Sequence, residues 1–251
     1  MAIAFAVTAP SAATETQADN PCQAPTQTVA SAAPLPRLEK LLQGKKAVRV
    51  LAIGSSSTVG VGASSPRLTY PVQLESELEK SFKGIHVAMV ARGVSGEIAE
   101  TTAERLKMEV ALNKPDLVLW QVGTNDALSR VPVEDFSRTV SRTLKWLKAN
   151  KIDVVIVGMQ FTRGVAKDEH YRLLKDALKQ IAQDENVPLI KRYEAMQYVE
   201  QMRDRLSLMS EDQLHLNDLG YRCMAEHVAK GILVSVFTTD AAQKAAATPS
   251  Q

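Results

Sequence analysis

Short apolar runs alternate with longer amphipathic segments through the middle of this chain. The runs at 48–53, 85–90, 117–122, 154–159 and 187–190 have the length of buried parallel strands, and the third is apolar apart from Gln121. Helical spacing of apolar residues follows Tyr70, recurs at 98–112, 133–149 and 168–183, and returns from Asn217 or Leu219 to Phe237. This alternation predicts right-handed βαβ crossovers, hence a three-layer α/β/α fold with a central five-stranded parallel sheet.

The two ends of the chain differ from this pattern. Residues 1–36 contain no Lys or Arg and are rich in Ala, Thr, Pro, Ser and Gln. Met1–Val7 is apolar and small residues follow it, which resembles an export signal without its positive start. We expect a signal-like segment and disordered linker over 1–36, a folded domain over 37–238, and a disordered tail over 239–251. A true signal predicts a periplasmic or secreted protein; otherwise the protein is cytoplasmic.

Composition narrows the classes of partner. The formal net charge is +2, and Lys and Arg form no dense run, so nothing favours a nucleic-acid partner. No apolar stretch approaches the roughly 18 residues that cross a bilayer, so we expect no integral membrane segment.

Polar and glycine-rich turns follow the first three predicted strands. They are Gly-Ser-Ser-Ser at 54–57, Gly-Val-Ser-Gly at 93–96 and Gly-Thr-Asn-Asp at 123–126. The carboxyl ends of parallel strands share one sheet edge, where α/β proteins bind ligands. Near the last helix, Asp212 precedes His215 by three residues, so its carboxylate can reach Nδ1 and leave Nε2 free to take a proton from a hydroxyl. This set predicts a serine hydrolase.

The four blocks, in this order, resemble the SGNH hydrolases, also called GDSL esterases, over roughly residues 46–236. Gly54-Ser55-Ser56 stands for the family's Gly-Asp-Ser, and the other blocks match at Gly96, at Gly123-Thr-Asn-Asp and at Asp212-Gln-Leu-His. Two positions depart from the family pattern. Ser55 replaces the aspartate of the first block, and Ala91-Arg92 stands where the second block usually has an asparagine.

The resemblance implies a flavodoxin-like fold and a role for each matched residue. Ser56 would be the nucleophile, His215 the general base, and Asp212 the group that orients the imidazole. The backbone amides of Ser56 and Gly96 and the side chain of Asn125 would hold the oxyanion. No cofactor is implied. A metal site is not expected either, because no second His or Cys lies at ligand spacing near His215.

The loop at 159–164 follows the fourth strand at the same edge. We expect Gln160, Phe161 and Arg163 to line an acyl or alcohol pocket, although an ordinary connecting loop is the alternative. With Tyr171 and Val-Pro-Leu at 187–189, this loop resembles the bacterial thioesterase/arylesterase branch of the family. The expected substrates are small-molecule, lipid or carbohydrate esters.

Three functions stay open at this point. The leading one is hydrolysis of carboxylic esters through an acyl-enzyme on Ser56. The second is a carbohydrate O-acetyl esterase acting on cell wall or exopolysaccharide. The third is a non-catalytic binding module of the same fold, to which only Ser55 points. The acyl group, the alcohol and the oligomeric state are not predicted.

The chain contains two cysteines, Cys22 and Cys223. On the last helix Cys223 lies opposite an apolar stripe, so we expect it near the surface, and Cys22 lies in the predicted linker. In an exported protein this pair would form a disulfide that ties the linker to the domain; free thiols are the alternative. The stripe consists of Tyr221, Met224, Ala225, Val228, Ile232 and Val236.

Overall fold

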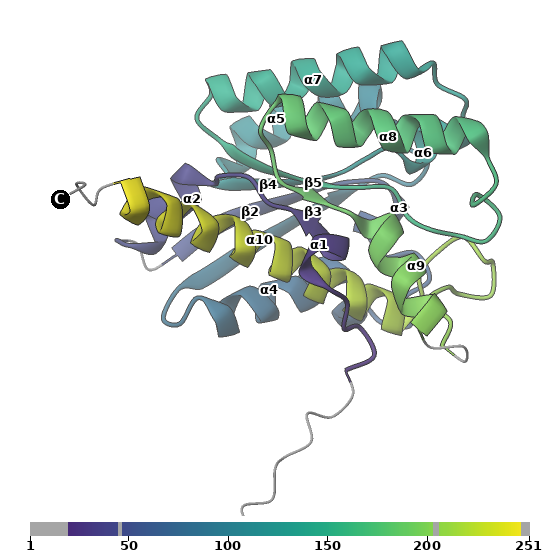
Figure 1. Cartoon of the computed structure of the whole chain (residues 1–251), viewed down its shortest axis with the longest axis horizontal. Coiled ribbons are helices and arrows are strands. Elements are labelled where there is room, and N and C mark those ends of the chain that lie inside the picture. The colour runs from purple at the N-terminus through teal and green to yellow at the C-terminus, as the bar shows by residue number, and fades with distance from the viewer. Residues whose placement is uncertain (1–19, 45–46, 203–205, 247–251) are drawn as a thin grey trace, which may run out of the picture.

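The computed structural model describes residues 20–44, 47–202 and 206–246. A six-stranded sheet lies at its centre in the spatial order β1-β6-β5-β4-β2-β3 (Figure 1). The five strands from β2 to β6 are parallel, as predicted, and β1 is added antiparallel to β6 at one edge. The strands are β1 (Ala30–Ser31), β2 (Ala47–Gly54), β3 (His86–Gly93), β4 (Leu117–Gln121), β5 (Asp153–Val157) and β6 (Leu189–Ile190).

Helices cover both faces of the sheet and make the three predicted layers (Figure 1). One face carries α5 (Ala99–Asn113), α7 (Val133–Ala149) and α8 (Glu169–Asp184). The other carries α4 (Tyr70–Ser81) and α10 (Asp218–Ala246), with the shorter α1 (Thr26–Val29), α2 (Pro36–Leu42) and α9 (Arg192–Met202). The short helices α3 (Ser56–Val59) and α6 (Thr124–Leu128) follow the carboxyl ends of β2 and β4.

The continuous apolar runs are explained by burial on both faces. In β4, Leu117 and Leu119 point into one core, and Val118 and Trp120 point into the other. Successive side chains of a strand alternate between faces, so a strand covered on both sides needs apolar residues at every position. Gln121 at the end of β4 is also buried, and its role lies in the site described below.

The N-terminal segment differs from the predicted linker. Residues 20–36 include α1, β1 and the first residue of α2, and Val29 and Leu35 are buried in the core. The strand β1 covers the edge of β6 through the pairs Ala30↔Ile190 and Ser31↔Leu189. The folded domain therefore begins by residue 20, earlier than the predicted residue 37. The signal-like segment predicted at the very start lies outside the described residues.

The cysteines are joined, but Cys223 is not near the surface as predicted. Cys22 and Cys223 form a disulfide with a Cα–Cα distance of 4.8 Å, and both side chains are 1% exposed. The N-terminal segment covers the polar face of α10, which the sequence pattern assigned to solvent. His227 Nε2 lies 2.7 Å from the Cys22 carbonyl oxygen, and Lys230 Nζ donates to the Ala24 carbonyl at 2.7 Å.

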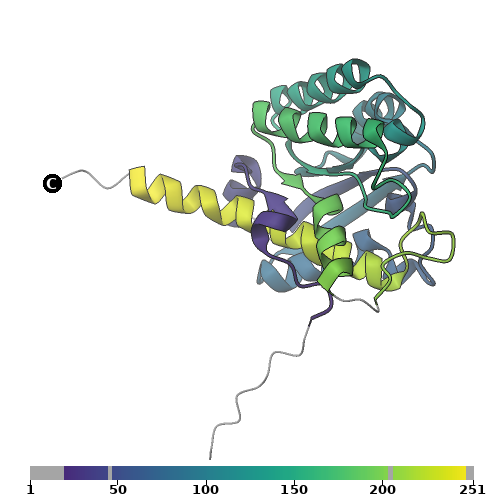
Figure 2. The same cartoon turned by 45° about the vertical axis from the view of Figure 1, so that its right-hand side comes forward.

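The last helix is longer than predicted. α10 continues to Ala246 instead of ending at 237, and Figure 2 shows it extending away from the body of the molecule. Four alanines lie between 241 and 246, and alanine has the highest intrinsic helix propensity. The predicted disordered tail is thus helical as far as 246, and its last residues lie outside the described part.

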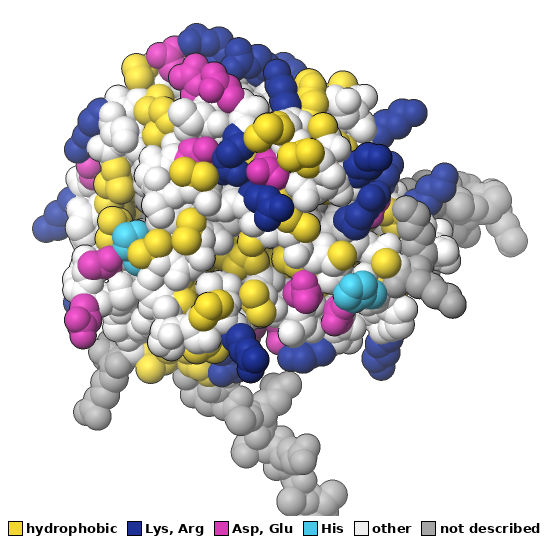
Figure 3. Space-filling model, turned by 180° about the vertical axis from the view of Figure 1, so that it is seen from behind, with side chains coloured by type: hydrophobic (Ala, Val, Ile, Leu, Met, Phe, Trp, Pro, Cys, Tyr) yellow, Lys and Arg dark blue, Asp and Glu magenta, His cyan; other side chains and the backbone are white. Residues whose placement is uncertain are grey.

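The remaining differences are small. The boundaries of α7 match the prediction, and the other predicted strands and helices shift by a few residues at their ends. α9 was not predicted, although it buries Ala195, Met196 and Val199. In the face seen in Figure 3, basic and acidic side chains both occur and hydrophobic ones lie in small groups. Among the described helices, none combines the length and apolar character needed to cross a membrane.

Candidate active site

The turn after β2 presents three serines in three different environments. Ser55 precedes α3 as its N-cap residue, and Ser56 and Ser57 form the first turn of this helix. Ser55 and Ser57 are each 4% exposed, whereas Ser56 is partly exposed. Ser56 is therefore the most accessible serine of this cluster, and its assignment as the nucleophile stays a prediction.

Gln121 holds Ser55 in its inward orientation. The Oε1 atom of Gln121 accepts hydrogen bonds from the backbone nitrogen of Ser55 at 2.8 Å and from its Oγ at 3.0 Å. A Cβ on Gly54 would lie 2.7 Å from both oxygens of Gln121, so only glycine allows this close approach. A neutral amide thus supports the turn at the position where Ser55 brings no charge of its own.

Asp212 and His215 form the pair that their spacing predicts. Asp212 Oδ2 lies 2.5 Å from His215 Nδ1, and Oδ1 accepts from the backbone nitrogens of Leu214 at 2.9 Å and His215 at 2.8 Å. Gln213 has φ 57°, a left-handed conformation that tightens the turn. With Nδ1 engaged by the carboxylate, Nε2 is the nitrogen left to exchange protons.

The same hydrogen bonds keep the carboxylate charged. The backbone N–H of His215, then its imidazole, then the backbone N–H of Leu214 hold the pKa of Asp212 well below its usual value. Because half of the Asp212 side chain is exposed, this pair adds little to folding stability. Its effect is local: Asp212 remains an anion, able to stabilise an imidazolium, at pH values where an ordinary aspartate is already protonated.

The histidine loop, residues 207–217, lies against the loop that follows Ser56. A Cβ on Gly62 would come within 2.4 Å of the Leu216 carbonyl oxygen and 3.2 Å of His215 Cβ. Tyr221 at the start of α10 donates its hydroxyl to the Val61 carbonyl at 2.7 Å. Within the described residues no hydrogen bond joins Ser56 Oγ to His215.

The candidate oxyanion donors come from the ends of β3 and β4. Gly96 is exposed and has φ 80°, a backbone conformation that glycine adopts without strain. Asn125 Nδ2 donates to the Glu97 carbonyl at 2.9 Å, which uses one of its two N–H groups and joins the two turns. The turn that carries Ser56 is joined to them as well, because Val94 N donates to the Gly54 carbonyl at 2.9 Å.

Of the three residues predicted to line a pocket, two are buried and one is exposed. Gln160 and Phe161 are 4% and 7% exposed, and Phe161 packs edge-on against Tyr193 with ring centroids 5.1 Å apart. These two residues belong to the interior. Arg163 is exposed and lines a hollow of about 450 Å³ beside the histidine loop.

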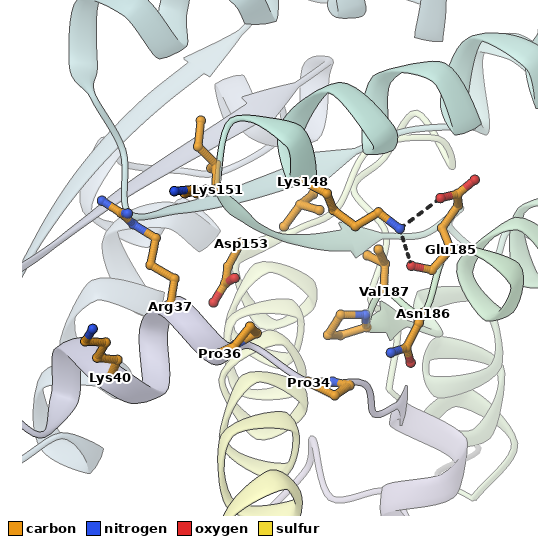
Figure 4. Close-up of a pocket in the computed structure, with 13 residues that line it drawn as sticks. Pro34, Pro36, Arg37, Lys40, Lys148, Lys151, Asp153, Glu185, Asn186 and Val187 are labelled. Carbon is orange, nitrogen blue, oxygen red and sulfur yellow. Dashed lines mark hydrogen bonds and ion pairs between the residues drawn. The ribbon is translucent and has the colours of Figure 1, made fainter.

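A second hollow, of about 580 Å³, lies at the opposite sheet edge (Figure 4). It is lined by Pro34, Arg37, Lys151 and Asp153 among others, near the amino ends of β5 and β6. Ser56, Gly96 and Asn125 all follow carboxyl ends of strands, so this hollow is separate from the candidate site.

Two polar residues of the site were not predicted. Gln121 had a signal, since it was the single polar residue of an otherwise apolar strand. Arg192, which is 2% exposed and donates to Ser57 Oγ at 3.0 Å, follows the short run at 187–190 without a motif around it.

The Asp212→Asn variant is expected to fold and to turn over esters up to about 10⁴-fold more slowly. An asparagine oxygen can still accept from the backbone nitrogens of Leu214 and His215, but its NH₂ group would donate to Nδ1 and favour the wrong imidazole tautomer. Measurement of kcat with p-nitrophenyl acetate, beside a circular dichroism spectrum, checks this. An unchanged kcat would remove Asp212 from the site.

Comparison with known structures agrees with this architecture. A two-domain esterase, CEX, active on acetylated mannans, superposes with a TM-score of 0.72 at 21% identity over 85% of this chain and 57% of its own. TesA gives 0.63 at 18% identity over 73% of this chain and 97% of its own. Axe2, an acetyl-xylooligosaccharide esterase from Geobacillus, gives 0.62 at 18% identity, covering 74% and 94%.

These structural similarities establish the fold. This chain spans little more than half the length of the two-domain esterase. No curated protein sequence matches the chain. The profile of the non-GDSL lipase-like family matches residues 21–238, which include β1, the cysteine pair and every candidate site residue. The name of this family, non-GDSL, is consistent with the serine at position 55, where the GDSL pattern has an aspartate. The chain belongs to the non-GDSL lipase-like family.

Proposed function

We propose that this protein is a serine esterase that hydrolyses carboxylic esters through an acyl-enzyme on Ser56. The observation that carries the proposal is the partly exposed Ser56, with the loop of the Asp212–His215 pair packed against the loop that follows this serine. Membership of a lipase-like family supports the same reaction class. No cofactor takes part in this chemistry.

The reaction proceeds in two steps, acylation of Ser56 and hydrolysis of the acyl-enzyme. Ser56 Oγ attacks the ester carbonyl carbon while His215 Nε2 takes its proton, and the amides of Ser56 and Gly96 with the Asn125 side chain stabilise the oxyanion. His215 then gives the proton to the leaving alcohol, and the acyl-enzyme remains. Water then attacks the acyl carbonyl carbon while His215 Nε2 takes its proton, and His215 returns that proton to Ser56 Oγ as the carboxylic acid leaves.

A carbohydrate O-acetyl esterase is the second candidate, and the hollow beside the histidine loop favours it. Arg163, Glu200, Ser207 and Gln213 contribute polar groups to this hollow, which could hydrogen-bond the hydroxyls of a sugar alcohol. Two structural neighbours act on acetylated mannans and on acetyl-xylooligosaccharides.

The acyl-chain dependence of kcat/KM distinguishes the two candidates. With a p-nitrophenyl ester series, a deacetylase is expected to lose activity sharply beyond about two to four carbons, because a closed acyl pocket rejects added methylenes. A general esterase keeps or gains activity with longer chains. Acetate release from acetylated mannan gives the parallel measurement on the carbohydrate. No turnover of any ester in either series would contradict the proposed activity.

We also propose that the protein is periplasmic or secreted. A disulfide between Cys22 and Cys223 supports this location, because such bonds persist mainly in oxidising compartments. A fusion reporter active only after export tests the proposal directly.

A further inference from the structure

Arg192 is a buried cation beneath the candidate active site. It is the first residue of α9, two positions after the end of β6, and 2% of its surface is exposed. Its place at the carboxyl end of the sheet puts it at the edge that also bears Ser56. Arginine is rarely buried this completely without a carboxylate partner, so its contacts call for an explanation.

One nitrogen of Arg192 joins two segments of the site. Nη2 donates to Ser57 Oγ at 3.0 Å and to Gln160 Oε1 at 2.8 Å. Gln160 in turn donates from Nε2 to the Leu214 carbonyl at 2.6 Å. Ser57 adjoins Ser56, and Leu214 adjoins His215. A series of three hydrogen bonds therefore links the turn that carries Ser56 to the loop that carries His215.

Two further hydrogen bonds hold Gln160 in place within this series of hydrogen bonds. Its backbone nitrogen donates to Thr124 Oγ1 at 3.2 Å, and its carbonyl accepts from the Tyr171 hydroxyl at 2.6 Å. The link thus rests on two buried residues, one at the start of α6 and the other in α8. This explains why a residue predicted to line the pocket is instead buried.

The charge of Arg192 is not neutralised by an acid. Within the described residues Arg192 takes part in no ion pair, and its Nε and Nη1 atoms are buried without a hydrogen-bond partner. The groups that face it are the hydroxyls of Tyr70, Tyr171 and Tyr221, whose pKa values burial raises, so they stay neutral. Such a cation costs stability, which indicates a role other than holding the fold together.

We propose that Arg192 is a positioning residue for the esterase reaction proposed above, holding the Ser56 turn and the His215 loop in register through Ser57 and Gln160. It does not touch the substrate. Its removal lets the two segments shift independently, and a misplacement of about 1 Å between reacting groups costs about 10²-fold in rate.

The Arg192→Met variant separates positioning from folding. Methionine fills a similar volume without charge, so we expect the thermal midpoint to stay the same or rise. At the same time kcat should fall about 10²-fold while KM stays within about threefold, because the loss concerns the reacting geometry and not substrate binding. A merely structural arginine would give the reverse: a lower midpoint with unchanged kcat per folded molecule.

Arg37→Met is the matched control. Arg37 also has a buried Nε without a hydrogen-bond partner, but it lies at the opposite sheet edge, in the hollow of Figure 4. This variant is expected to keep wild-type kcat. Arg37 is otherwise partly exposed and paired with Asp116. Equal losses of kcat in Arg37→Met and Arg192→Met would mean that replacing an arginine far from the site has the same effect, and would overturn the proposal.

Ser57→Ala and Gln160→Met test the same link with Arg192 still present. Each is expected to lower kcat about tenfold, and adding either to Arg192→Met should cost nothing further, since residues that act through one contact are not additive. These two variants also decide the matter if Arg192→Met fails to fold. Wild-type kcat in both, or losses that multiply in the double variants, would overturn the proposal.

Failure of the esterase proposal would look different. A fluorophosphonate probe reports the nucleophile directly. Wild-type protein that is not labelled and hydrolyses no ester contradicts the esterase activity itself. Wild-type protein that is labelled and active, together with an Arg192→Met variant of undiminished kcat, contradicts only the role of Arg192.

Discussion

The Ser56→Ala variant is expected to lose both ester hydrolysis and covalent labelling by a fluorophosphonate probe. Loss of a catalytic serine costs on the order of 10⁶-fold in kcat, and His215→Ala should cost about as much, because the two groups act as a unit. The structure gives a reason for this register. Ser55 Oγ is engaged by Gln121 and Ser57 Oγ by Arg192, which leaves Ser56 as the serine directed toward a substrate.

The two neighbouring serines are the controls for that experiment. Ser55→Ala loses one hydrogen bond to Gln121, worth about 0.5 to 1.5 kcal/mol, and keeps the other from its backbone nitrogen. Ser57→Ala should be slower but still labelled. Ser55→Asp, which restores the family residue, should remain active. Label that survives in Ser56→Ala and disappears in Ser55→Ala or Ser57→Ala would move the nucleophile, and a wild-type protein without label would favour the binding module.

Removal of the disulfide is expected to lower the free energy of unfolding by about 5 kcal/mol in the chain-entropy estimate. The bridge joins residues 201 positions apart in sequence, so it restricts the unfolded chain strongly. It also fastens the segment that supplies β1 to the edge of β6. Urea unfolding of wild-type protein and a Cys22→Ala/Cys223→Ala variant measures the difference.

Chemical reduction supplies the control. Wild-type protein treated with a phosphine should unfold at the same lower urea concentration as the double variant, which itself should not respond to the reductant. Thiol titration of the denatured, unreduced protein should find no free thiol, and two free thiols would show that the bridge does not form in the protein.

The sequence predicted those parts of the molecule that depend on local pattern. Strands buried on both faces, such as β4, read as continuous apolar runs, and α7 shows its apolar stripe and both of its ends. Ser56, Gly96 and Asn125 could be assigned to one sheet edge because each of them follows the carboxyl end of a strand. Asp212 and His215 were predictable as a pair because their contact spans three residues.

The parts that were missed depend on contacts between distant residues. The 20–36 segment is rich in Ala and Pro and has no periodic apolar pattern, and its contacts are with α10 and β6, which are distant in sequence. Cys223 was predicted to be exposed because no local sequence pattern indicates that Cys22 and Ala24 cover that face of α10. Arg192 meets Ser57, a residue 135 positions earlier, and no spacing in the sequence connects them.

The bridge between Cys22 and Cys223 makes a covalent ring of everything between them. A protease that cuts this ring once, for example beside the exposed Arg163, nicks the protein without releasing a fragment. Both pieces stay joined, and each carries part of the site: Ser56 on one, His215 on the other. Nicked molecules would therefore run as one species on a non-reducing denaturing gel and as two after reduction, and a thiol reductant, not the first cleavage, would separate the piece with Ser56 from the piece with His215.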